Sequence, residues 1–161
     1  MDLYGLLVFV HAATVLLFFI AHGTSMAVAF RLQSEQDPAR VRALLDLSRY
    51  SLGVPSLVTV LTGLITGIAA GFFGAWWGQL WIWVSLVLFV AVGIGMTPLV
   101  TMRLVPIRTA AGMAGPKDEA PPAENPEEMR RLIAAWNPWP VAVVGLGAFL
   151  LILWLMLAKP F

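Results

Sequence analysis

The residues of this chain with the clearest chemical potential are its two histidines, His11 and His22. Both lie inside one apolar run, from Leu3 to Arg31, which contains no Asp, Glu, Lys or Arg before its last residue. A run of this length predicts a helix that spans a membrane. An ionisable group inside such a helix indicates a functional site, because imidazole ligates metals and titrates near neutral pH.

The spacing of the histidines limits what they can do together. They are eleven residues apart, so on a helix they point within about 20° of each other and lie roughly 16 Å apart along the axis. They share a face, which we expect to point into the protein together with Met26, but they cannot share one metal ion. Each ring either ligates haem iron or another metal, or relays a proton, or sits neutral and hydrogen-bonded to a neighbouring helix. The last interpretation is favoured.

A cofactor would need further ligands. A haem held by two histidines of one chain needs them on two helices, so a haem at His11 would use Met26, Met96 or Met102, another axial group, or a second subunit. Copper also suits His and Met, but Met96 and Met102 lie about 120° apart on their helix. We therefore expect no cofactor, with haem or copper at His11 as the alternative.

The sequence lacks the residue sets that other kinds of catalytic or binding chemistry need. The chain has no cysteine, which excludes disulfides, thiolate catalysis and cysteine-based metal sites. It shows no nucleophile–base set, no phosphate-binding or dinucleotide fingerprint, and no acid within a span. The net charge of +1 gives no indication of nucleic-acid binding. We expect a protein that is not an enzyme.

The elements that position these side chains follow from composition. Hydrophobic residues make up 60% of 161, charged residues 12%, and the mean hydropathy is +0.85, far from the roughly 25% charged of a soluble domain. The sequence predicts an all-α, four-span, up-down membrane bundle in one domain, 1–161, with spans at about 3–30, 54–74, 80–104 and 140–158. Short interfacial helices are expected after Asp37-Pro38 and Asn125-Pro126, where an N-cap precedes a proline. The first helix lacks the features of a cleaved signal, and we expect it to be retained.

Glycines recur every four residues in the second span, at Gly63, Gly67 and Gly71. Residues four apart share a helix face, and small residues let another helix approach closely. This face predicts tight packing, either within the bundle, between copies in a homo-oligomer, or within a larger membrane complex. In the third span, Pro98 is expected to kink the helix.

The basic residues predict the orientation. Nine of the ten lie in or beside two connections, 31–53 and 105–139, and they are Arg31, Arg40, Arg42, Arg49, Arg103, Arg108, Lys117, Arg130 and Arg131. This asymmetry places both connections in the cytoplasm and both termini outside. We expect the basic residues of the first connection to anchor to anionic lipid headgroups, and the Pro/Gly-rich segment 112–126 to be mobile.

Several stretches resemble a known family. FVHAATVLLFFIAHG, LSRYS, VLTGLITG and WWGQLWIWVSLVLFV are similar to a bacterial family of predicted four-helix integral membrane proteins of unassigned function. That family looks like a distant relation of the membrane domain of copper resistance protein D. The resemblance covers about 1–108 and implies a bacterial cytoplasmic membrane. It also singles out His11, since a similar first-helix histidine occurs in haem-dependent protoporphyrinogen oxidases. Those enzymes use an intramembrane lysine, which this chain lacks, so the activity is not carried over.

The function that fits these observations is that of a non-catalytic or accessory membrane subunit in contact with the lipid bilayer. A haem- or copper-binding bundle at His11 is the alternative, and a small-solute or ion carrier is a third hypothesis. The spans show no continuous polar lining, which a carrier would need.

Overall fold

The structure is a computed structural model that describes residues 2–52, 54–115 and 120–161. It contains α1 (Leu3–Leu32), α2 (Pro38–Leu52), α3 (Val54–Phe73), the 3-10 turn η1 (Trp76–Gly78), α4 (Leu80–Ala110), α5 (Pro126–Ala134) and α6 (Trp139–Ala158). The part of the chain described here is helical, without strands, and α1, α3, α4 and α6 are long and apolar enough to cross a membrane. The prediction of an all-α polytopic membrane protein is confirmed.

Local signals explain where the helices begin. The Asp37 carboxylate accepts a hydrogen bond from the Ala39 amide (2.9 Å) at the start of α2. The Asn125 side chain likewise accepts from the Glu128 amide (3.1 Å) at the start of α5. Each cap satisfies an amide that the first turn of a helix leaves without a partner. Two short polar helices therefore form where the sequence predicted them.

The third span continues further than predicted. We expected a connection from residue 105, but α4 runs unbroken through Pro98 and Pro106 to Ala110. Leu104, Ile107 and Ala110 are buried on one side of this extension, and that spacing of three residues is the packing face of a helix. Packing thus outweighs the cost of a proline in the helix.

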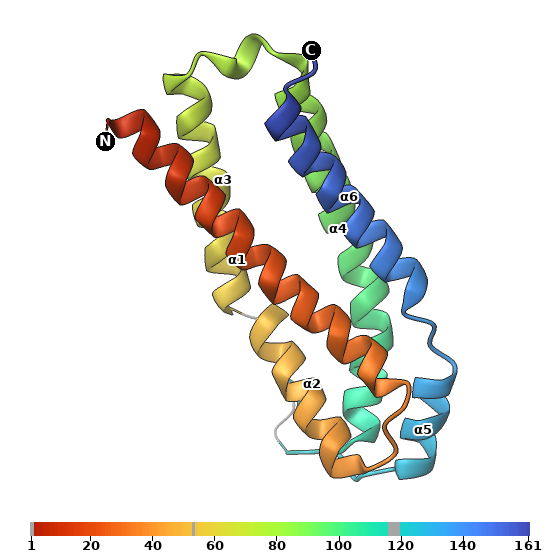
Figure 1. Ribbon diagram of the computed structural model, residues 1–161. Helices are drawn as coiled ribbons and strands as arrows, with labels where there is room; N and C mark the ends of the chain where they lie inside the picture. Colours follow the sequence, from red (N-terminus) through yellow and green to blue (C-terminus); the bar gives the residue numbers. More distant parts are fainter. Residues whose placement is uncertain (1, 53, 116–119) are drawn as a thin grey trace.

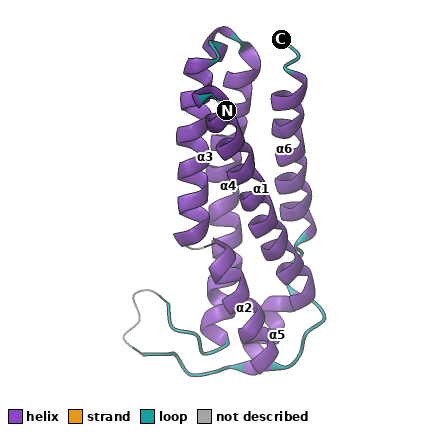
Figure 2. Cartoon of the chain, turned by 60° about the vertical axis from the view of Figure 1, so that its left-hand side comes forward, coloured by secondary structure: helices purple, strands orange, loops and turns teal. Residues whose placement is uncertain are grey.

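The spanning helices associate as two pairs. Figures 1 and 2 show α1 against α3 and α4 against α6, with both termini at one end and α2 and α5 together at the other. The pairs also touch each other, since the rings of Phe19 and Phe149 stack with centroids 4.5 Å apart. The four spans therefore alternate in direction along the chain, and the two charged connections lie at the same end.

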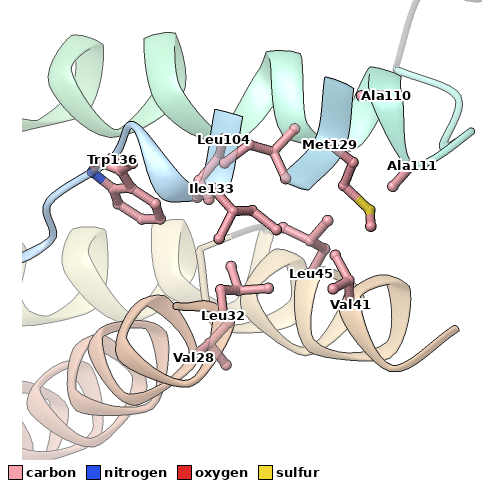
Figure 3. Packing of buried hydrophobic residues seen from close by; sticks show 11 residues of the cluster. Val28, Leu32, Val41, Leu45, Leu104, Ala110, Ala111, Met129, Ile133 and Trp136 are labelled. Atoms are coloured by element: carbon pink, nitrogen blue, oxygen red, sulfur yellow. The ribbon is translucent and has the colours of Figure 1, made fainter. Parts of the chain in front are cut away.

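The best-packed core lies at that charged end. There α2 and α5 close over the ends of α1 and α4, and Leu32, Val41, Leu45 and Met129 have no exposed surface (Figure 3). By contrast, the only buried residues of α1 are Val28 and Leu32, at its last two turns. We call this closed end the cap, defined by its buried residues Val28, Leu32, Val41, Leu45, Leu104, Ile107, Ala110, Ala111, Met129, Ile133 and Trp136.

The segment expected to be mobile is partly attached to the cap. Glu124 forms an ion pair with Arg42 of α2, and the Asn125 amide donates to the Ala110 carbonyl (2.8 Å). Its middle, 116–119 with Lys117, lies outside the described residues. The connection is therefore fixed to α2 and α4 at its second end, an arrangement that its composition did not predict.

Candidate functional site

His11 sits at the contact between α1 and α3. Its Nδ1 lies 2.8 Å from the carbonyl oxygen of Gly63, which can only accept a hydrogen bond, so Nδ1 carries the proton and donates. In the neutral ring, Nε2 then has a free lone pair. No hydrogen bond joins Nε2 to the described part of the chain. The ring is partly buried, and Nε2 is its nitrogen that remains able to accept or to ligate.

The glycine face of α3 is what admits this ring. A Cβ placed on Gly67 would stand 2.8 Å from both Cε1 and Nδ1 of His11, and one on Gly63 would stand 3.0 Å from the hydroxyl of Thr14. Real Cβ atoms essentially never approach other atoms more closely than 3.0 Å. The missing side chain at Gly67 therefore creates the space that the imidazole fills, and α1 and α3 approach closely for this reason.

Gly71 completes the row but contacts a different element. A Cβ there would lie 3.1 Å from Nε1 of Trp77, just after the end of α3. All three glycines thus face side chains of their own chain. The homo-oligomer expected through this face stays a prediction, and a contact through these glycines would require α1, and at Gly71 the Trp77 ring, to move away.

His22 does not share the environment of His11. We expected it to face the interior, but its side chain is exposed, and its ring lies against Phe18 with centroids 5.1 Å apart. The reason is the oblique path of α1 over α3 (Figure 1). The contacts of α1 with the glycine row end near Thr14, eight residues before His22. A shared direction on one helix does not ensure a shared neighbour.

The three methionines considered as ligands, Met26, Met96 and Met102, lie away from His11. Met26 is fifteen residues further along α1, or about 22 Å along the axis. Met96 packs towards Gly145 of α6, and Met102 is 72% exposed. Within the described ranges no three His, Cys, Asp or Glu residues gather closely enough to hold a metal ion. A second ligand to a metal at His11 would therefore have to come from outside this set.

A second cluster, which the sequence analysis missed, lies at the end that carries the termini. The indole of Trp76 donates to the Tyr4 hydroxyl (3.1 Å), and the ammonium of Lys159 lies 4.1 Å from the Trp76 ring centroid and 5.9 Å from that of Trp81. This cation–π contact joins the end of α6 to η1, and through Trp76 to α1. The predicted up-down topology places the start of the first span, the connection between the second and third spans and the end of the fourth span on one side of the membrane, which is the signal that could have indicated the cluster.

Comparison with known families agrees with this architecture. A family model described as "Predicted integral membrane protein (DUF2269)" matches residues 5–160. The chain belongs to this family. No curated protein and no solved structure matches it. The family description and the four apolar helices support a multi-pass membrane location and contact with lipid. The prediction that the chain belongs to a membrane-protein family of unassigned function is confirmed.

Proposed function

We propose that this protein is a non-catalytic accessory membrane protein, in which four spans hold a rigid helical cap at one membrane surface. The observation that carries this proposal is the distribution of packing. The cap has a closed core like that of a small soluble domain, whereas α1 buries no residue before Val28. A rigid cap on lipid-exposed spans suits a protein that positions or stabilises a partner.

The use made of His11 supports the same proposal. Its ring fills the space above Gly67 and joins α1 to the backbone of α3 at Gly63. This is the hydrogen-bonded, packing role that polar side chains commonly take between membrane helices. The imidazole thus has a structural task that requires no cofactor.

The proposal is tested on purified protein in mild detergent. We expect a colourless, metal-free preparation by absorbance and metal analysis, and after gentle extraction from its own membrane a particle with more polypeptide than one 17.5-kDa chain. A Soret band or stoichiometric copper would overturn the non-catalytic assignment. A particle holding one chain only would overturn the accessory role.

One observation favours a second candidate, a haem- or copper-binding bundle. A ligating histidine usually donates its other ring N–H to a carbonyl or carboxylate, and the Nδ1 of His11 does so towards Gly63. Met26, Met96 and Met102 lie away from His11, so a further ligand would come from a second subunit or another group. Under this hypothesis His11→Ala abolishes the absorbance or metal content while the helical circular dichroism persists. A band that survives the substitution excludes His11 as the ligand.

Two finer hypotheses are tested separately. A kinship with copper resistance protein D predicts copper bound at His11, which the same metal analysis measures. The small-solute or ion carrier hypothesis predicts flux in proteoliposomes above that of empty vesicles, and equal flux in both would exclude it.

We also propose a bacterial cytoplasmic membrane with both termini outside and both charged connections in the cytoplasm. The asymmetry of basic residues supports this orientation, and so does the position of α2 and α5 at one end. Because the chain has no cysteine, single substitutions report topology cleanly. In intact cells, an impermeant maleimide should label Gln79→Cys, and should label Gln36→Cys only after permeabilisation. The opposite pattern would invert the orientation.

A further inference from the structure

A shallow groove runs between the last turn of α1 and the outer face of α2. Its volume is about 370 Å³, and it is lined by Arg31, Glu35, Arg40, Ala43, Leu44 and Leu47. The charged residues come from the end of α1 and the start of α2, and the apolar residues from the following turns of α2. The groove is therefore polar at one end and apolar at the other.

Its depth in the membrane can be placed from α6. That helix has 20 residues and is about 30 Å long, which equals the thickness of the hydrocarbon. Its first residue, Trp139, packs its ring on Phe30 with centroids 4.8 Å apart, and Arg31 follows Phe30 directly. Arg31 thus lies at the membrane boundary. Since α2 leads from Pro38 towards α3 (Figure 1), Leu47 lies nearer the bilayer than Arg40 does.

The carboxylate in the groove is held more firmly by hydrogen bonds than the two arginines are. Glu35 is 9% exposed, and besides Arg31 its carboxylate accepts from the Gln36 and Asp37 amides (3.1 and 3.2 Å). Its charge is therefore held by the backbone of the turn. The side chains of Arg31 and Arg40 are 59% and 70% exposed. Arg31 pairs with Glu35 (3.4 Å) and donates to the Ser34 hydroxyl (3.2 Å), and Arg40 pairs with Asp37 (3.6 Å). Such exposed pairs contribute little, and a guanidinium offers five N–H donors.

We propose that this groove binds one anionic phospholipid from the inner leaflet. The phosphodiester lies between Arg31 and Arg40, whose planar donors match its oxygens, and the glycerol and upper acyl chain lie along Leu44 and Leu47. Of the two carboxylates that pair with these arginines, Glu35 is held by the backbone of the turn, and Asp37 makes only an exposed 3.6 Å contact with Arg40. A phosphodiester therefore has only weak, exposed ion pairs to displace. The site does not depend on the accessory role, but its place in the inner leaflet rests on the orientation proposed above.

The test is a lipid titration of the full chain in detergent, followed by native mass spectrometry with phosphatidylglycerol and phosphatidylcholine. We expect one phosphatidylglycerol to bind more tightly than phosphatidylcholine. The double variant Arg31→Gln/Arg40→Gln should bind phosphatidylglycerol roughly 30-fold more weakly, since each basic residue near the surface contributes about a factor of five. The matched control Arg130→Gln/Arg131→Gln removes the same charge from α5 and should retain the affinity.

A further variant and a competition experiment test the proposal independently of the arginine substitutions. Leu47→Glu keeps both arginines and should also weaken phosphatidylglycerol binding, which covers the case in which the arginine double variant fails to fold. Soluble glycerol 3-phosphate should not compete, because it lacks the acyl chain. Equal losses in the groove and control variants, no preference over phosphatidylcholine, or full competition by glycerol 3-phosphate would each overturn the proposal.

Discussion

Substitution of Gly67 by alanine is the sharpest test of how α1 and α3 associate. The new Cβ would stand 2.8 Å from two atoms of the His11 ring, whereas ordinary van der Waals contact begins at 3.4 Å. Either the ring or the helix must therefore shift by about half an ångström. The ring cannot move alone without straining its hydrogen bond to Gly63.

The expected cost combines three effects. Overpacking of a close contact costs about 1–3 kcal/mol, and loss of a hydrogen bond between membrane helices costs about 0.6–1.7 kcal/mol. Alanine recovers about 0.8–1 kcal/mol because it favours the helix more than glycine does. We therefore expect Gly67→Ala to lower the free energy of unfolding by about 0.6–4 kcal/mol.

The assay is unfolding of the detergent-solubilised protein, followed by circular dichroism. The matched control is Gly93→Ala in α4, where an added Cβ meets nothing within 4 Å, and which should be neutral or slightly stabilising. In the double variant Gly67→Ala/His11→Ala the obstructing ring is absent, so alanine at 67 should cost less than it does beside His11. The reasoning fails if Gly67→Ala is as stable as Gly93→Ala, or if the cost at 67 is the same with and without the imidazole.

Three further predictions concern the two ends of the molecule. Lys159→Met should lower stability by about 0.5–2 kcal/mol through loss of the cation–π contact with Trp76, seen as a lower melting temperature, and an unchanged melt would contradict that contact. Leu45→Ala in the cap, where the side chain is fully buried, should lower the free energy of unfolding by about 2–5 kcal/mol. Leu157→Ala, at a side chain that is 75% exposed on α6, should lower it far less in the same detergent. Equal losses would refute the cap as the main core. The hydrogen bond from Arg131 lowers the pKa of Glu128. This pair therefore adds a small stabilisation, which is present above the ordinary glutamate pKa and is lost as the pH falls through the lowered pKa. Arg131→Gln should raise the pKa of Glu128 in an NMR titration, and an unchanged pKa would exclude Arg131 as the cause of the lowered value.

Sequence alone determined the membrane architecture and most helix starts. Four apolar runs predict four spans because hydrocarbon leaves no alternative partner for backbone amides. Asp37 and Asn125 predict where α2 and α5 begin, because capping is a contact between residues two or three positions apart. The end of α4 was predicted wrongly. The local sequence indicated a connection from residue 105, but packing keeps the helix intact through Pro106 to Ala110.

Only the tertiary structure decided which neighbours these helices have. Periodicity placed His11 and His22 on one face, but the path of α1 over α3 brings a glycine to His11 and leaves His22 exposed. The contact of Lys159 with Trp76 and the closed core of the cap join residues far apart in the chain. A repeat along one helix gives the direction of each side chain, whereas its partner depends on the angle at which another helix crosses, and no local pattern encodes that angle.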